Sequence, residues 1–190
     1  MKKIPVMIGS LAAVCTAFLV FLSFFLLLPQ NMDLPKLTNP RIVIKKAERK
    51  LEVFNGDKFI KAYKMVLGFK PAGDKEVEGD GKTPEGKFYV FTKNTESKFH
   101  LSLGVSYPGL EDAKRGLDAK LISQEEYDEI MSALNEKRMP LQKTKLGGEI
   151  YIHGGGAKSD WTDGCVALAD EEITELFNAI PVGTEVEIQP

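Results

Sequence analysis

A glycine-rich stretch near the C-terminus reads Ile152-His153-Gly154-Gly155-Gly156-Ala157-Lys158-Ser159-Asp160-Trp161-Thr162-Asp163-Gly164-Cys165-Val166. Its cysteine, Cys165, is the only one outside the apolar N-terminal segment of the chain. That segment has the features of a membrane signal, so the remainder is expected outside the cytoplasm, where thiols normally pair as disulfides. An unpaired thiol next to glycines, twelve positions after His153, is typical of a nucleophile with its base.

The residue types in this stretch suit acyl transfer. A thiol attacks as the thiolate, and a nearby histidine promotes its ionisation, so His153 can take the proton of Cys165. Backbone N–H groups around Gly164 and Cys165 can stabilise a tetrahedral oxyanion. Glycines at positions 154–156 allow the backbone to approach a substrate closely. Spacing alone leaves the alternative open, which is an inert buried cysteine and a core histidine.

Most of the chain upstream of this stretch has a strand pattern. Short segments rich in branched and aromatic residues, separated by turn residues, predict strands at 41–46, 50–54, 58–67, 88–92 and 99–105. Further strands are expected at 149–153, leading into the glycines, and at 184–188. Residues 70–86, with four glycines and two prolines, are expected to form a loop.

Two segments have helical patterns instead. Ser123 and Glu126 form a capping box, and Tyr127, Ile130, Met131 and Leu134 follow at the spacing of one helix face. This helical insert, within residues 111–140, is expected either to wall a cleft as a lid or to cover the core. A second helix is expected from Asp170, as its N-cap, to Ile180. The fold class is therefore mostly β with helical inserts.

The N-terminus predicts a membrane anchor. Lys2 and Lys3 precede an apolar run over 4–28, and about 20 such residues can span a bilayer. The run lacks a small-x-small site at its end, which favours an uncleaved anchor over a cleaved signal peptide. Cys15 lies inside the run and is interpreted as a small apolar residue, not a lipidation site. The expected organisation is an anchor at 1–28, a proline-containing linker at 29–40 and one domain at 41–190.

The charge balance gives no sign of nucleic-acid binding. Two of the 25 basic residues precede the apolar run. The rest of the chain therefore has 23 basic and 27 acidic residues, which gives a net charge of about −4. No basic block occurs, so nucleic acid is not an expected partner.

Two motifs resemble those of the L,D-transpeptidase (YkuD-type) family. The first is His153-Gly154 followed by Thr162-Asp163-Gly164-Cys165-Val166, and the second is Gly79-Asp80-Gly81-Lys82-Thr83-Pro84-Glu85-Gly86-Lys87-Phe88, a loop that ends in Thr-Pro-x-Gly before a strand. The resemblance covers roughly residues 41–189. It implies a β-sandwich-like domain and a role in cell wall cross-linking or remodelling, and hence in cell shape.

The resemblance also implies roles for individual residues. Cys165 would attack the carbonyl of the third residue of a peptidoglycan stem peptide, form a thioester and release a terminal D-alanine. An amine from another stem, or from a lipoprotein, would then resolve the acyl-enzyme. His153 would be the general base and the Gly154 carbonyl would orient its ring, with no metal or cofactor. The expected location is the inner membrane, single-pass, with the catalytic domain facing the periplasm or the cell wall.

The chain departs from the commoner family pattern near the cysteine. Asp163 stands where many members have a second histidine, Ala167 where many have arginine or asparagine, and the gap between His153 and Cys165 is short. A carboxylate beside a thiolate would raise the thiol pKa, so Asp163 is expected to point away or to pair with Lys158. Two alternatives stay open: a peptidoglycan hydrolase (an L,D-carboxypeptidase or amidase) on the same scaffold, and a non-catalytic wall-binding module.

Several further residues are candidates for the oxyanion or substrate site. They are Gly164, Asp163, Thr162, Trp161, His100 and Tyr107. Trp161 could shield the thiol, stack on sugar or simply pack, and Tyr107 lies in a Ser-Tyr-Pro-Gly turn expected at the cleft rim. His100 could line the cleft or be an ordinary polar strand residue. Zinc held by His100, His153 and Cys165 is disfavoured, because three isolated ligands lack clustered spacing.

Overall fold

A computed structural model of the chain describes residues 34–190. The predicted membrane segment at 4–28 therefore lies outside the described residues, and the predicted linker is described only from Leu34 onward. Over residues 34–190, no helix combines the length and the apolar character needed to cross a bilayer.

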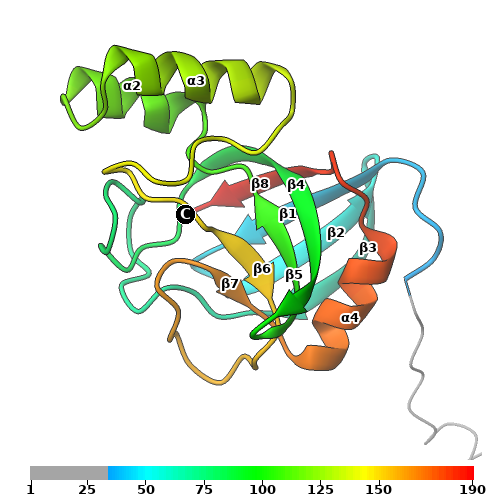
Figure 1. The fold of residues 1–190 in the computed structure, drawn as a ribbon. Coiled ribbons are helices and arrows are strands. Elements are labelled where there is room, and N and C mark those ends of the chain that lie inside the picture. Colours follow the sequence, from blue (N-terminus) through cyan, green and yellow to red (C-terminus); the bar gives the residue numbers. More distant parts are fainter. Residues whose placement is uncertain (1–33) are drawn as a thin grey trace, which may run out of the picture. The chain divides into compact units, whose positions relative to one another are not determined.

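Eight strands form a single sheet in the order β3-β2-β1-β8-β4-β5-β6-β7 (Figure 1). In chain order the strands are β1 (Pro40–Lys45), β2 (Lys50–Asn55), β3 (Lys58–Lys64), β4 (Gly86–Ser97), β5 (His100–Val105), β6 (Tyr151–His153), β7 (Val166–Ala167) and β8 (Glu185–Gln189). Neighbouring strands are antiparallel except for two parallel pairs, β1 with β8 and β6 with β7.

The long strand β4 curls the sheet, because its two ends pair with different neighbours. Gly86–Tyr89 pairs with β8, whereas the remainder, after a register shift, pairs with β5. The two halves of the sheet enclose a common core, in which Ile42 and Val186 from one half share a cluster with Leu103 and Ile152 from the other. The predicted mostly β class is confirmed, and the sandwich-like arrangement comes from one continuous curled sheet.

The three described helices agree only partly with the sequence expectations. α3 (Gln124–Asn135) begins after Ser123, whose side chain accepts from the Glu126 N–H as the capping box predicts. α2 (Leu110–Asp118) was not predicted as a separate helix. α4 (Asp170–Ala179) has Ala169 at its N-cap, so the assignment of Asp170 as N-cap was wrong by one residue. The Glu172 carboxylate accepts from the Ala169 N–H in place of a capping hydroxyl.

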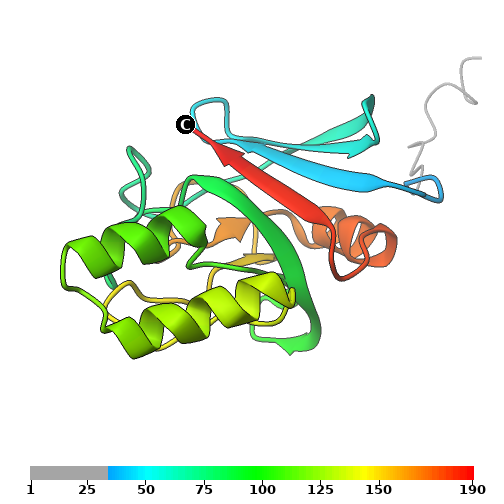
Figure 2. The same cartoon turned by 90° about the horizontal axis from the view of Figure 1, so that it is seen from above.

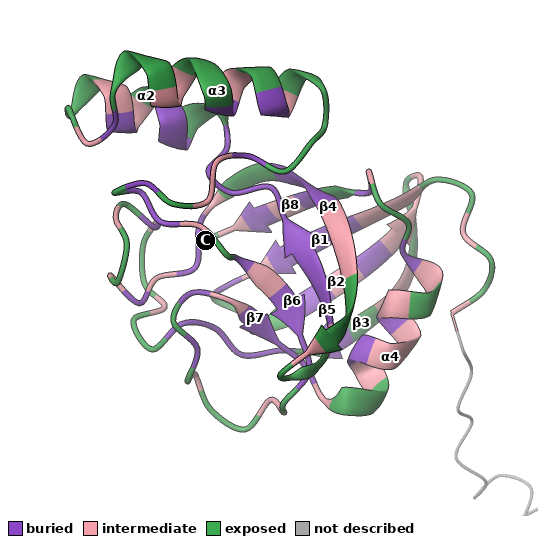
Figure 3. Ribbon diagram, viewed as in Figure 1, coloured by how far each residue is buried: buried purple, intermediate pink, exposed green. Residues whose placement is uncertain are grey.

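The α2–α3 insert has a small core of its own. Ala113, Ile122, Ile130 and Leu146 form a buried cluster separate from the main core. The two helices run side by side along one side of the sheet (Figure 2), and their buried residues face the rest of the domain (Figure 3). The insert is therefore a satellite of the sheet, not a cover for the main core.

Candidate active site

Strand register brings His153 and Cys165 to the same face of the sheet. In the parallel pair β6–β7, Ile152 lies opposite Val166 and His153 opposite Ala167. Alternate residues of a strand share a face, so Cys165, one residue before β7, projects on the side of His153 while Ile152 and Val166 enter the core. A diagonal neighbour on adjacent strands is within reach of a histidine ring.

The Cys165 thiol is held by two backbone groups. Its Sγ accepts from the Tyr151 N–H and donates to the Glu149 carbonyl, both at 3.4 Å. Burial raises the pKa of the thiol to about 11; the Tyr151 N–H opposes this rise and the charge of Asp163 adds to it. Cys165 is a free cysteine that keeps part of its surface exposed. At neutral pH the thiol is therefore protonated and needs a base to become a nucleophile.

His153 has the orientation and protonation state of such a base. Its Nδ1 donates to the Gly154 carbonyl at 2.6 Å, which leaves Nε2 as the basic nitrogen. Burial lowers the pKa of the ring, with the Gly154 hydrogen bond opposing the shift, so the imidazole is neutral at pH 7. Only glycine fits at position 154, because a Cβ there would lie 2.6 Å from Asp170 Oδ1 and 2.8 Å from the Phe99 carbonyl.

A tight turn presents Cys165. The Thr162 hydroxyl donates to the Cys165 carbonyl at 2.7 Å and accepts from the Gly164 N–H at 3.2 Å. Gly164 has φ +138°, and a Cβ there would lie 2.7 Å from the Lys82 carbonyl. The Gly164 N–H is thus already engaged and is not free to bind a substrate oxyanion. Thr162 is buried and shapes the turn instead of facing a substrate.

Asp163 is exposed, and within residues 34–190 it forms no ion pair with Lys158. The expected pairing with Lys158 is therefore not observed, and the charge of Asp163 raises the pKa of the Cys165 thiol. The acidic partner that fixes this loop is Asp160, which accepts from Arg49 at 2.7 Å and from the Leu67 N–H at 2.9 Å. The sequence analysis missed this role, because Arg49 lies more than a hundred residues away.

The Thr-Pro-Glu-Gly loop packs against the cysteine turn. The Thr83 hydroxyl accepts from the Gly68 N–H at 3.2 Å, and a Cβ on Gly68 would lie 3.2 Å from the Gly164 Cα. The buried Lys46 ammonium donates to the carbonyls of Gly73 and Thr83 and to Glu85, at 2.6, 2.8 and 2.8 Å. This loop therefore supports the turn and contributes no reactive group.

Two aromatic residues enclose the His153 ring. Phe99 stacks on it at 4.6 Å between ring centroids, and Trp161 meets it edge-on at 5.6 Å. Trp161 also donates from Nε1 to the Gly156 carbonyl at 3.2 Å. Trp161 was expected near the site, whereas Phe99 was assigned only to a strand. Phe99 lies just before β5, whose pairing with the His153 strand was not predicted, so the sequence carried no signal that could have found it.

Two predicted site residues lie elsewhere. His100 is exposed, and its Nε2 pairs with the Thr174 hydroxyl of α4 at 2.8 Å. Tyr107 is wholly buried, and its hydroxyl donates to the Leu146 carbonyl at 3.0 Å, so its expected place on the cleft rim was wrong. A turn sequence predicts a bend in the backbone but not the direction of the aromatic side chain.

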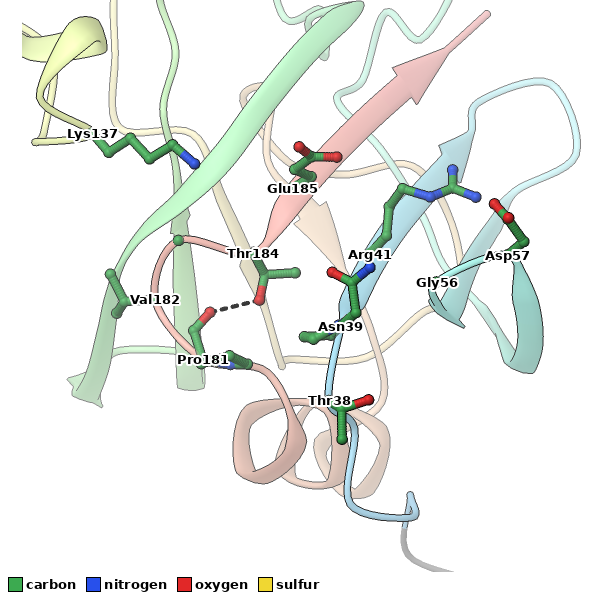
Figure 4. Close-up of a pocket in the computed structure, with 12 residues that line it drawn as sticks. Thr38, Asn39, Arg41, Gly56, Asp57, Lys137, Pro181, Val182, Thr184 and Glu185 are labelled. Carbon is green, nitrogen blue, oxygen red and sulfur yellow. Dashed lines mark hydrogen bonds between the residues drawn. The ribbon is translucent and has the colours of Figure 1, made fainter.

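A polar groove of about 550 Å³ lies away from these residues (Figure 4). Its lining comes from the chain before β1, the β2–β3 turn and the segment between α4 and β8, where the Thr184 hydroxyl donates to the Pro181 carbonyl at 2.8 Å. It includes none of the residues proposed from the sequence. The candidate residues Cys165 and His153 lie in the β6–β7 region and do not line this groove.

Comparison with known proteins identifies relatives of the domain. The family model for the L,D-transpeptidase catalytic domain matches residues 39–188. The helical cell shape determining protein Pgp2 from Campylobacter jejuni has a similar structure, with a TM-score of 0.54 and 20% identity over 85% of this chain and 51% of that one. Bd1075 from Bdellovibrio bacteriovorus is similar at a TM-score of 0.53 and 22% identity, over 83% of this chain and 52% of that one. The chain thus spans about half the length of these structures. No curated protein sequence matches it.

Proposed function

The chain belongs to the L,D-transpeptidase catalytic domain family, and we propose that it is a cysteine acyltransferase acting on peptidoglycan stem peptides. The observation that carries the proposal is the strand register that sets Cys165 and His153 on one face, with the His153 Nδ1–H fixed on Gly154. The similarity to Pgp2, a helical cell shape determining protein, supports a substrate in the cell wall.

The proposed reaction starts from a neutral thiol and a neutral imidazole. His153 Nε2 takes the thiol proton as Cys165 Sγ attacks the acyl donor carbonyl, and the Cys165 N–H stabilises the oxyanion. Collapse of this intermediate breaks the amide bond, and the imidazolium gives its proton to the departing amine. A second amine, from another stem or from a lipoprotein, then attacks the thioester and restores the thiol. The Gly154 carbonyl orients the ring, as a carboxylate does in a serine protease triad.

We also propose that the domain works outside the cytoplasm, tethered by the apolar run over 4–28. The support for this location is the sequence: Lys2 and Lys3 before the run favour a cytoplasmic N-terminus. The Cys165 thiol can stay reduced and act as a nucleophile in an oxidising compartment, because the described domain offers it no cysteine with which to form a disulfide.

The test uses mass spectrometry of products from a tetrapeptide stem donor, with and without an amine acceptor. The wild-type chain should give the cross-linked product and a Cys165 thioester. Cys165→Ala should lose on the order of 10³-fold or more of the rate. Cys15→Ala, which removes the other cysteine, is the matched control and should behave as wild type.

Each other outcome has a definite meaning. Undiminished turnover by Cys165→Ala would end the proposal. Release of tripeptide without cross-linked product, even with excess acceptor, would assign the chain to the hydrolases instead. Absence of both a product and a carbapenem adduct on Cys165 would leave a wall-binding module as the function.

A further inference from the structure

The imidazole of His153 is shielded from water by two rings that are themselves exposed. Phe99 stacks on it with 24° between the ring planes, and Phe99 and Trp161 contact each other edge to face at 5.2 Å. His153 is 2% exposed, whereas Phe99 and Trp161 are 42% and 38% exposed. The two aromatic side chains therefore meet the solvent in place of the base.

Phe99 is delivered by the tip of the β4–β5 hairpin, and this tip is fixed at both sides. The Phe99 N–H donates to Ser97 Oγ at 3.1 Å, and His100 adopts a left-handed backbone with φ +73°. The Thr174 hydroxyl donates to the Asp170 carbonyl at 2.7 Å, so it accepts from the Nε2–H of His100. His100, placed here by the hydrogen bond to α4, thus holds the hairpin tip over the site.

We propose that Phe99 is a positioning residue for His153, which rests on the general-base role proposed above. Its ring covers one face of the imidazole, excludes water from it and keeps the Nδ1–H on the Gly154 carbonyl, so that Nε2 is the nitrogen presented to Cys165. The contact also joins the hairpin tip to the glycine loop, because the Phe99 carbonyl oxygen lies 2.8 Å from where a Cβ of residue 154 would be. Loss of the Phe99 ring should therefore admit water to the His153 imidazole and leave its orientation less fixed.

The electrostatics of the imidazole agree with this role. Burial is the main cause that lowers the pKa of His153, and the Gly154 hydrogen bond opposes it. The ionisable side chains on the segments packed around the ring are Lys98, His100, Lys158, Asp160, Asp163, Cys165, Asp170, Glu171 and Glu172. Removing the aromatic cover should raise the pKa toward the ordinary 6.5, because water then stabilises the imidazolium.

The direct test is a histidine ring titration by NMR on the full 190-residue chain, which contains only two histidines. His153→Gln assigns the two signals. In wild type the His153 signal should titrate below 6.5 and report the Nδ1–H tautomer. Phe99→Ala should raise the midpoint and mix the tautomers, and Phe99→Tyr, which keeps the ring, should restore both.

The matched control is Phe59→Ala. Phe59 is 52% exposed on β3, at the opposite edge of the sheet from β7, and its ring packs on Phe54. This variant should leave the His153 signal as in wild type. Phe99→Leu replaces Phe99→Ala in the titration if the alanine variant fails to fold. It should shift the titration midpoint of His153 in the same direction. An unchanged midpoint and tautomer in both Phe99→Ala and Phe99→Leu, or an equal shift in Phe59→Ala, would overturn the proposal.

A second readout separates this proposal from the proposed function. The rate at which a carbapenem acylates Cys165 should fall by up to about fourfold at pH 6 in Phe99→Ala and less at pH 8, because the base is then more protonated at the lower pH. A shifted His153 signal in a chain that neither acylates nor turns over would contradict the function while supporting the placement of Phe99. Normal wild-type turnover with an unshifted signal in Phe99→Ala would contradict the role of Phe99 alone.

Discussion

Cys165 and His153 are both in the neutral form in the resting domain, with no thiolate–imidazolium ion pair. Burial raises the pKa of the thiol to about 11 and lowers that of the imidazole, so at pH 7 both groups are uncharged. Cysteine enzymes with a thiolate–imidazolium pair have thiol pKa values several units below the ordinary value. In the proposed reaction the proton must therefore move during attack, and the rate should follow the fraction of neutral His153.

The pH profile of acylation tests this order of events. As pH falls through the lowered pKa of His153, the base becomes protonated and the rate should drop, with the midpoint below 6.5. Above that midpoint the rate should stay level to about pH 9, because the thiol ionises only near 11. Single-turnover acylation of Cys165 by a carbapenem, followed by mass spectrometry, gives the profile.

His153→Ala is the companion variant for that profile. It should lose about 10²- to 10⁴-fold at pH 7, and its residual rate should rise roughly tenfold per pH unit with the thiolate fraction. A wild-type rate that stays level down to pH 4 would instead indicate a preformed thiolate, contrary to the neutral pair.

Among the secondary-structure elements, those with a periodic apolar pattern could be predicted from the sequence. The elements and contacts that depend on tertiary packing could not. Strands β1, β2 and β5 alternate or carry branched residues, so their patterns are local. Helix α2 escaped prediction because the residues that it buries, Asp112, Ala113 and Gly116, are small or polar, and a Cβ on Gly116 would lie 2.8 Å from Leu146. The candidate pair of Cys165 and His153 was proposed from its motif, whereas Phe99 reaches His153 only through the pairing of Ser102 with His153.

The segment after α3 controls the resting position of the thiol. The Gln142 side chain accepts from the Glu149 N–H at 2.7 Å and donates to the Tyr107 carbonyl at 3.0 Å. Glu149, which has φ +56°, in turn offers its carbonyl to the Cys165 S–H. The segment after α3 is thus linked to the Cys165 thiol through Gln142 and Glu149, and no local pattern in the sequence could indicate this link.

Gln142→Ala should free the Glu149 carbonyl from the thiol. An acceptor for S–H stabilises the neutral form, so its loss should lower the pKa of Cys165 from about 11. A decrease of about one unit would raise the thiolate fraction, and the rate of alkylation by iodoacetamide at pH 8, about tenfold. Acylation by substrate should slow, since the sulfur is less well oriented.

Peptide mass spectrometry on Cys165 measures the alkylation rate. Gln124→Ala is the control, because Gln124 is exposed on α3 and bonds only to Asp128 of the same helix. Equal alkylation rates in Gln142→Ala and wild type would show that Glu149 does not restrain the thiol.

On the scale of the whole domain, a charged network joins the insert to the loop that follows β3. Arg115 of α2 pairs with Asp74 at 3.0 Å and with Asp112 at 2.7 Å, and it donates to the Lys75 carbonyl at 2.7 Å. The Asp112 carboxyl is almost wholly buried and accepts from the Gly109 N–H at 2.9 Å. The insert is therefore attached through the Asp112 carboxyl group, whose ionised form is destabilised by burial.

The pH dependence of stability should report this carboxyl. Burial raises the pKa of Asp112 from 3.8 to about 6, so the folded chain binds this proton more tightly than the unfolded chain. The stabilisation linked to the proton is therefore complete below pH 3.8 and is lost as pH rises through about 6. The shift corresponds to about 2 to 3 kcal/mol in the free energy of unfolding.

Asp112→Asn removes the titration and should leave the chain at least as stable as wild type at pH 7. Urea unfolding of both proteins between pH 4 and pH 7 should show their stability difference changing by about 2 to 3 kcal/mol. Asp128→Asn, at an exposed position on α3, is the matched control and should show no such change. A difference between wild type and Asp112→Asn that stays constant with pH would mean that Asp112 is already ionised in the folded domain at pH 4. In that case the ion pair with Arg115, and not the buried proton, would fasten the insert to the sheet.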